Sequence, residues 1–208
     1  IGVDIEGGGT TSIRITDDGG GIEPEELELA VAPHATSKIV SVDDLDAIAT
    51  LGFRGEALAS ISAVSRFSIV SRPQGRDAAM KIEVEGDQVG TPAPAAGPYG
   101  TTITVRNLFF NTPARRRFLK TDQTESSRVT EAVRHLALPH PSIGFTLRSG
   151  ERTTIDLPPG QTPAERVVGV LGRELAEGLI EIDTRVGDVG MWGMIGRPEL
   201  ARGTAQHV

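Results

Sequence analysis

Apolar residues alternate with polar or small ones over the first sixteen positions of the chain. Ile1, Val3 and Ile5 stand at every second position, and the same spacing resumes at Ile13 after the glycine triplet 7–9. A period of two on both sides of a glycine turn is typical of paired strands with one buried face. The pattern predicts a β-hairpin at the start of the chain.

Further strands and helices are predicted from the same kind of spacing. Alternating residues predict strands at 67–71, 80–84, 103–105, 145–147 and 153–157, and two alternating runs around a glycine turn predict a hairpin over 179–195. Apolar residues three or four positions apart predict helices that begin at Glu56 and Asp122, and a proline with acidic residues in a first turn predicts helices that begin at Pro24 and Thr162. The proline-rich segment 90–100 and the polar segment 32–55 are expected to be loops, the second around a short helix at 43–49. Strands and helices are intermixed, so the fold class is α+β.

Capping residues and turns divide the second half of the chain. Asp122 with Glu125 has the spacing of a capping box, and Thr162 is expected to cap a helix that carries Glu165 in its first turn. We expect a domain boundary near 160–178. Residues 1–163 are assigned to a first domain, and residues 164–208 to a linker helix and the start of a second α/β domain. Because the chain opens without methionine and stops within a pattern, we expect it to be a fragment.

Composition excludes several classes of function. The 208 residues carry 21 basic and 28 acidic side chains, a formal charge of −7, which excludes a uniformly basic nucleic-acid coat. There is no cysteine, so disulfides, zinc–thiolate sites and cysteine nucleophiles are excluded. The four histidines show no metal-ligand spacing. No apolar run reaches the roughly 18 residues of a membrane helix, and we expect a soluble intracellular protein.

The segment Asp17-Asp18-Gly19-Gly20-Gly21 follows a predicted strand and precedes a helix. Glycines let a flat ligand lie against the backbone, and a buried carboxylate accepts hydrogen bonds but donates none. Such a site favours a base that offers an amino group, as adenine does. A simple polar turn after a strand is the alternative interpretation.

A second glycine-bearing segment, Gly52-Phe53-Arg54-Gly55-Glu56-Ala57-Leu58, leads directly into a predicted helix. The first turn of a helix presents unpaired N–H groups and a partial positive charge, and both attract phosphate. The chain contains no G-x-x-x-x-G-K-[ST] phosphate loop. A structural turn is the alternative.

Polar groups in two other segments could also reach a nucleotide. Thr36, Ser37 and Lys38 offer two hydroxyls and an ammonium to phosphate oxygens, in the weakly periodic segment 32–55. Thr101, which follows Gly100 at the entry of a predicted strand, could bond a base edge or only cap the strand.

Basic residues gather between Arg106 and Lys120, where no acidic residue occurs. Arg115, Arg116 and Arg117 are consecutive within this stretch and could contact DNA phosphates. A solvated surface turn is the alternative.

Together and in this order, five motifs resemble those of a known family. They are Asp17-x-Gly19-x-Gly21, His34-Ala-Thr-Ser-Lys38, Gly52-Phe-Arg-Gly-Glu-Ala-Leu58, Gly100-Thr101-Thr102 and Asn111-Thr-Pro-Ala-Arg115. The chain resembles, over essentially 1–208, the amino-terminal ATPase region of MutL-type DNA mismatch repair proteins, within the GHKL superfamily. The resemblance implies a Bergerat-type sandwich of a mixed sheet covered by helices.

The resemblance also implies roles for individual residues in binding ATP. Asp17 is expected to accept the adenine amino group, with Gly19 and Gly21 beside the base and Thr101 in contact through water. Backbone groups at the helix start are expected to hold the phosphates, and a lid to cover them. The residues assigned to these two tasks are Gly52, Arg54, Gly55, Glu56, Ala57 and Leu58 for the helix start, and Thr36, Ser37 and Lys38 for the lid.

The catalytic groups of this family have no counterpart among the 208 residues. The family's general-base glutamate and its magnesium-binding asparagine are expected upstream of Ile1, and a lysine that reaches the γ-phosphate is expected beyond the last residue. No catalytic or metal-binding residue is therefore assigned. We expect the intact protein to hydrolyse ATP with Mg²⁺ slowly, and this chain alone to turn over little.

Partners and location follow from the resemblance as well. ATP is expected to order the lid and to pair two amino-terminal regions into a dimer. The dimer is expected to bind DNA without sequence specificity and to work with a MutS-type mismatch-recognition protein. The expected location is the cytoplasm of a bacterium, at the nucleoid, or the nucleus of a eukaryote, with no membrane contact. A nucleotide sensor that does not hydrolyse ATP, and another GHKL ATPase, remain as alternatives.

Overall fold

The computed structural model describes residues 1–33 and 55–200, with only the backbone at Trp192. The chain divides into two compact units. Unit 1 is formed by Ile1–Val129 with Leu147–Thr154, and unit 2 by Thr130–Thr146 with Ile155–Val208. None of the described helices is long and apolar enough to span a membrane.

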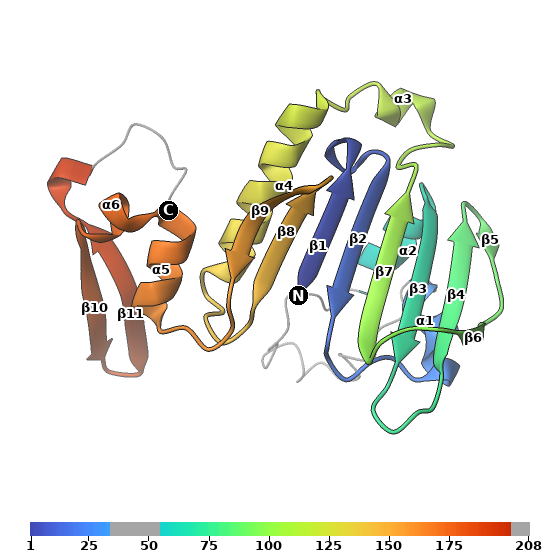
Figure 1. Ribbon diagram of the computed structural model, residues 1–208, viewed down its shortest axis with the longest axis horizontal. Helices are drawn as coiled ribbons and strands as arrows, with labels where there is room; N and C mark the ends of the chain where they lie inside the picture. The colour runs from blue at the N-terminus through green and yellow to red at the C-terminus, as the bar shows by residue number, and fades with distance from the viewer. Residues whose placement is uncertain (34–54, 201–208) are drawn as a thin grey trace. The chain divides into compact units, whose positions relative to one another are not determined.

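A nine-stranded sheet is the main element of the described residues (Figure 1). Its strand order is β5-β4-β3-β7-β2-β1-β8-β9, and β6 also pairs with β4. The strands are β1 (Gly2–Glu6), β2 (Ser12–Asp17), β3 (Arg66–Arg72), β4 (Ala79–Glu85), β5 (Gln88–Val89), β6 (Ala93–Ala95), β7 (Gly100–Arg106), β8 (Phe145–Ser149) and β9 (Arg152–Leu157). Neighbours β1 and β8 point the same way in Figure 1, whereas β1 and β2 are antiparallel. The sheet is mixed and the class is α+β, as predicted.

One face of this sheet carries the core of unit 1. Apolar residues at alternate positions of β3, β4 and β7 pack against α1 (Leu27–Val31), which follows the 3₁₀ turn η2 (Pro24–Glu26), and against Leu58 of α2 (Ala57–Ser62). In Figure 1 both helices lie behind the sheet. The period-two pattern is thus the reason why one face is apolar. Its buried members are Leu27, Val31, Phe67, Ile69, Ile82, Val84 and Val105.

The predicted hairpin at the start of the chain is present as β1 and β2. Its glycine triplet forms the 3₁₀ turn η1 (Gly7–Gly9), in which all three residues have positive φ. A Cβ at Gly8 would lie 2.7 Å from the carbonyl oxygen of Asp122, so the turn packs against the start of α4 (Asp122–Ala137). Only glycine satisfies both the φ angle and this close approach.

Two sequence predictions in unit 1 need correction. The segment 90–100 was expected to be loop, but its residues Ala93–Ala95 form the edge strand β6. Pro94 lacks an N–H group, and an edge strand accepts a proline where a central strand would not. The predicted capping box of Asp122 with Glu125 is not formed: the hydroxyl of Thr121, one residue earlier, accepts from Thr124 N–H at 3.3 Å, and Glu125 accepts from Lys120 N–H at 2.8 Å.

The sequence did not predict two short helices, whereas two predicted helices and a predicted hairpin are confirmed. The unexpected helices are α3 (Pro113–Arg116) and α6 (Arg173–Ala176). The long helix α4 (Asp122–Ala137) is present, and unit 2 contains α5 (Pro163–Leu171), the predicted hairpin of β10 (Leu179–Val186) with β11 (Val189–Gly196), and the turn η4 (Pro198–Leu200).

The start of α5 carries a complete capping box. Thr162 Oγ1 accepts from Glu165 N–H at 3.2 Å, and the Glu165 carboxylate accepts from Thr162 N–H at 2.8 Å. The backbone hydrogen bond from Thr162 lowers the pKa of the Glu165 carboxyl below its usual value. The sequence prediction of this N-cap is confirmed.

Replacing Thr162 by alanine is expected to lower the free energy of unfolding by about 0.5–2 kcal/mol, because one helix N–H loses its acceptor. The pKa of Glu165 is lower in the folded protein than in the unfolded chain. The ionised carboxylate therefore stabilises the folded protein fully above the ordinary carboxyl pKa, and this stabilisation is lost as pH falls through the folded pKa. Urea denaturation at pH 7 and at pH 3 measures both effects. A Thr162→Ala penalty that is larger at pH 3 than at pH 7 contradicts this coupling.

Candidate functional site

Three polar residues form one row across neighbouring strands at the edge of the core face. Asp17 at the end of β2 pairs with Thr101 of β7, and Thr101 pairs with Ser71 of β3. Two positions away, Ile15 and Ile103 form the adjacent row on the same face. Ile15 is 39% exposed, so an open apolar surface lies beside the polar row.

The carboxylate of Asp17 is fixed through one of its two oxygens. Oδ1 accepts the N–H of Gly19 at 2.9 Å and the N–H of Thr101 at 3.3 Å. Within the described residues, no hydrogen bond or ion pair engages Oδ2. The arrangement presents one oriented acceptor, with a negative charge, at the end of the strand.

Thr101 and Ser71 lie deeper, at 8% and 1% exposure. Their hydroxyl oxygens are 3.0 Å apart, Ser71 Oγ donates to the carbonyl of Gly100 at 3.2 Å, and it accepts the N–H of Ile22 at 2.7 Å. Ser71 therefore connects β3, the start of β7 and the segment that follows the glycine-rich turn.

Two glycines permit the close approaches around this row. Gly21 has φ +79°, and a Cβ there would lie 2.7 Å from the nitrogen of Pro73. Gly100 has φ +94°, and a Cβ there would collide with the carbonyl oxygen of Asp17. Glycine at these two positions thus allows two backbone segments to pack closely together. The predicted contact of Gly19 and Gly21 with a base stays a prediction.

The connection between β3 and β4, residues 73–78, is braced beside Gly21. Arg76 pairs with Glu23 at 2.7 Å, and this hydrogen bond raises the pKa of the arginine. The guanidinium of Arg72 lies 4.2 Å from the centre of the Tyr99 ring and donates to the carbonyl of Arg76 at 3.0 Å. These exposed contacts hold the loop that closes one side of the row.

The predicted phosphate-binding segment is described only in part. Gly55 has φ +64°, Glu56 is the N-cap of α2 without a side-chain cap, and Leu58 packs against the core of unit 1. This helix therefore begins on the same face of the sheet as Asp17. The other predicted residues of the site, Thr36, Ser37, Lys38, Gly52 and Arg54, and the predicted helix at 43–49, lie outside the described residues.

Residues 1–33 and 55–200 contain no group of three His, Asp or Glu side chains that could hold a metal ion. The described part of the chain therefore offers no carboxylate cluster for Mg²⁺.

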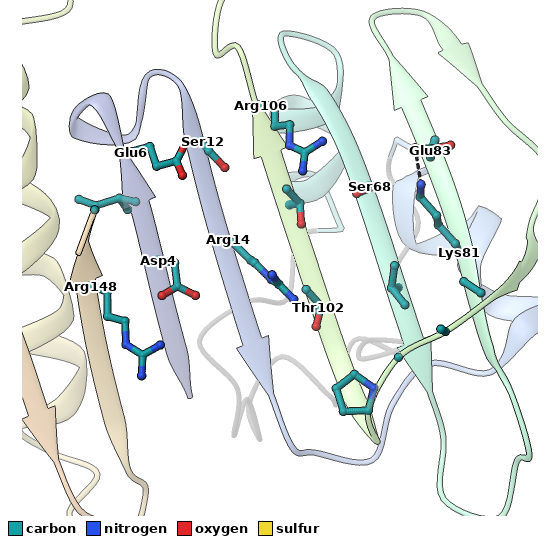
Figure 2. Close-up of a pocket in the computed structure, with 18 of the residues that line it drawn as sticks. Asp4, Glu6, Ser12, Arg14, Ser68, Lys81, Glu83, Thr102, Arg106 and Arg148 are labelled. Atoms are coloured by element: carbon teal, nitrogen blue, oxygen red, sulfur yellow. Dashed lines mark ion pairs between the residues drawn. The ribbon is translucent and has the colours of Figure 1, made fainter. Parts of the chain in front are cut away.

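The opposite face of the sheet carries a cavity of 890 Å³ that the sequence did not predict (Figure 2). Its labelled side chains have both signs of charge, among them Asp4, Arg14 and Arg148, and Lys81 pairs with Glu83 at 2.6 Å. We call this surface the open face. These are the polar positions of the alternating pattern, which is typical of the solvated side of a sheet.

The predicted DNA contacts lie on and just after α3. Arg115, Arg116 and Arg117 are exposed, and among the described residues none of them forms an ion pair. Phe118 beside them is 79% exposed. An uncompensated basic segment with an exposed aromatic ring is compatible with binding nucleic acid.

Ser71 and Arg166 are buried polar residues that the sequence analysis did not single out. Ser71 ends the apolar series Phe67 and Ile69, and a hydroxyl at an inward position was a usable signal. Arg166 of α5 is fully buried, and its only signal is the four-residue spacing to the buried Val170.

Comparisons with known proteins agree with this fold. MutL proteins of Acidiphilium cryptum and Anaeromyxobacter dehalogenans are 49% and 45% identical over 100% and 99% of the chain, which spans only 35% and 34% of their lengths. The Aquifex aeolicus MutL ATPase domain complexed with ADP is a structural neighbour with a TM-score of 0.68 and 32% identity, over 88% of this chain and 63% of that one. The N-terminal domain of a DNA repair protein has a TM-score of 0.71 and 25% identity, over 88% of this chain and 54% of that one. No family model matches the chain.

The mixed sheet, its helix-covered face and these structural neighbours define the class as a GHKL-type ATPase domain. The alternative of a GHKL protein from another branch is disfavoured by the relatives, which match over the whole chain. The chain belongs to the MutL-type DNA mismatch repair proteins, of which it represents the ATPase region.

Proposed function

We propose that the row formed by Asp17 and Thr101 binds the adenine of ATP. The observation that carries the proposal is the carboxylate of Asp17, which is fixed by two N–H donors to Oδ1 and leaves Oδ2 as an acceptor. Adenine offers an amino group to such an acceptor, whereas guanine would bring a carbonyl oxygen to it. The exposed side chain of Ile15 provides an apolar surface for the ring. The Aquifex aeolicus MutL ATPase domain is complexed with ADP, which supports nucleotide binding by this fold.

The phosphates are proposed to lie at the start of α2. Gly55 reaches its left-handed conformation without strain, and N–H groups of a first helical turn favour anionic oxygens. Gly52, Arg54 and the lid residues Thr36–Lys38 stay predictions. Mg²⁺ also stays a prediction, since the described residues show no ligand set for it.

The activity of the whole protein extends this proposal. We propose slow ATP hydrolysis, ATP-dependent ordering of the lid, amino-terminal dimerisation and cooperation with a MutS-type protein on bacterial nucleoid DNA. The assignment of residues 1–163 and 164–208 to two domains also stays a prediction. The general base is assigned to no residue of this chain.

Phosphate release from ATP and binding of a non-hydrolysable analogue test the function together. The protein is expected to bind the analogue, and the variant Gly55→Val is expected to lose most of this binding. A valine at this position is strained by the positive φ, and its side chain would block the phosphates. Gly150→Val is a matched control at a turn with φ +59° and open space for the side chain. If the full-length protein binds the analogue but releases no phosphate from ATP, hydrolysis is refuted and the protein is a nucleotide sensor. Normal analogue binding by Gly55→Val contradicts the phosphate site.

We further propose that the basic segment 115–117 contacts DNA phosphates. Replacing Arg115, Arg116 and Arg117 together by alanine is expected to lower DNA affinity and to reduce the salt slope of log K by about 0.9 for each phosphate that an arginine no longer neutralises. Fluorescence anisotropy with labelled duplex between 50 and 200 mM salt, roughly the range where such interactions dominate, measures the slope.

The open face supplies a control with the same loss of charge. Arg14, Arg106 and Arg148 also have no ion-pair partner among the described residues, and their triple alanine variant is expected to keep the slope. An equal decrease of slope in both triple variants contradicts a DNA site at α3.

A further inference from the structure

Ser71 has one hydroxyl proton and three polar neighbours. Its oxygen receives the N–H of Ile22 at 2.7 Å, it donates to the carbonyl of Gly100 at 3.2 Å, and it lies 3.0 Å from the hydroxyl oxygen of Thr101. A serine hydroxyl donates once and accepts through two lone pairs. All three contacts are hydrogen bonds only if Ser71 donates to Gly100 and Thr101 donates to Ser71.

This proton order determines what Thr101 can offer to a ligand. When its own proton is used toward Ser71, the hydroxyl of Thr101 presents only lone pairs to any other partner. The reverse order would free the Thr101 proton but would leave the contact from Ser71 to Gly100 without a hydrogen. Both side chains are buried, and a buried site favours the order that satisfies more groups.

Two acceptors then stand side by side on neighbouring strands. Asp17 and Thr101 are directly paired in the register of β2 and β7. The side chains of such a pair lie on one face about 5 Å apart. An exocyclic amino group carries two N–H donors and suits this pair, directly or through a water molecule, whereas a carbonyl oxygen is repelled by both acceptors.

We infer that Ser71 is a positioning residue, which fixes the hydroxyl of Thr101 as an acceptor and thereby selects 6-amino purines over 6-oxo purines. The inference rests on the proposed binding of adenine at Asp17. Ser71 contacts no ligand in this account and acts only through Thr101.

Calorimetric affinities for ADP and for inosine diphosphate test the inference, because the two ligands differ at the 6-position and its neighbouring ring nitrogen. In Ser71→Ala the hydroxyl of Thr101 is free to turn its proton toward a carbonyl oxygen. The preference for ADP over inosine diphosphate is expected to fall roughly five- to tenfold, the size of one neutral hydrogen bond, while Asp17 retains part of it. A general loosening of the site would weaken both ligands equally and leave the ratio unchanged.

Matched variants separate the possible outcomes. Ser68→Ala, on the same strand but on the open face of Figure 2, is expected to keep the ratio, and Ser71→Thr, which retains the hydroxyl, is expected to restore it. In a Thr101→Val background, Ser71→Ala is expected to change the ratio no further, since no hydroxyl is left to orient. Where Ser71→Ala does not fold, Ser71→Cys supplies a weaker acceptor of similar shape. An unchanged ratio in folded Ser71→Ala, or in Ser71→Cys where the alanine variant does not fold, overturns the inference, whereas a protein that binds neither ligand overturns the proposed adenine site.

Discussion

The variant Asp17→Asn is expected to bind ADP about ten- to a hundredfold more weakly than the unaltered chain. Its amide oxygen can replace Oδ1 toward Gly19 and Thr101, so the turn keeps its hydrogen bonds. The amide NH₂ then faces the nucleotide, where it meets the adenine amino group donor to donor, and the charge-assisted hydrogen bond is lost. Isothermal titration with ADP measures the change.

The same substitution is expected to shift the base preference from 6-amino toward 6-oxo purines. The amide NH₂ donates a hydrogen bond to the carbonyl oxygen of a 6-oxo purine, so inosine diphosphate is expected to lose less affinity than ADP or to gain some. Asp18→Asn is the matched control, because Asp18 is the exposed neighbour and its substitution removes the same charge. Equal ADP affinity in Asp17→Asn and the unaltered chain refutes base recognition by Asp17.

The variant Arg166→Met is expected to lower the free energy of unfolding by about 3 kcal/mol or more. Arg166 is fully buried in unit 2, and its guanidinium donates to four carbonyl oxygens at 2.7–3.2 Å. Methionine keeps much of the volume but leaves those oxygens without donors, and each buried orphan costs about 1–3 kcal/mol. The four acceptors belong to Ala137, Pro141, Ile143 and Pro158.

Electrostatics explains why an arginine is tolerated there. Burial lowers the pKa of Arg166, yet no carboxylate pairs with it among the described residues. The carbonyl of Ala137 is the last of α4, where the helix dipole favours a positive charge, and the ring of Phe145 lies 5.7 Å from the guanidinium carbon.

Denaturant unfolding with an exposed control tests the role of Arg166. Arg173→Met removes the same charge from the exposed helix α6 and is expected to change stability by less than about 0.5 kcal/mol. Arg166→Lys is expected to fall between the two, because one ammonium cannot reach all four carbonyls. A stability of Arg166→Met equal to that of Arg173→Met contradicts the account.

The sequence predicted the elements whose patterns are local. The alternation around residues 7–9, the acid and proline at the start of α5, and the strands later found as β3, β4 and β7 are confirmed because burial of one face imposes the period on the sequence. The edge strand β6 was missed because its proline content is typical of a loop and its pairing with β4 depends on tertiary contacts. The cap at Thr121 was misplaced by one residue because Thr121 and Asp122 are both good capping residues.

The sequence suggested site residues only where the local sequence around a residue indicates its chemistry. Asp17 with its glycines was singled out by its position at a strand end, and Thr101 by its position at a strand entry together with the resemblance. Ser71 acts through partners that lie 29–49 positions away in the sequence, and no local pattern reports such contacts. For the same reason Arg166 gave little signal, because its acceptors lie on separate segments of unit 2.

A crystal structure of the protein with a non-hydrolysable ATP analogue tests the central claim most directly. The account predicts the purine on the core face, with its 6-amino group at hydrogen-bond distance, about 2.7–3.2 Å, from Oδ2 of Asp17. Packed side chains in that place, or the nucleotide bound in the cavity of the open face, would contradict it.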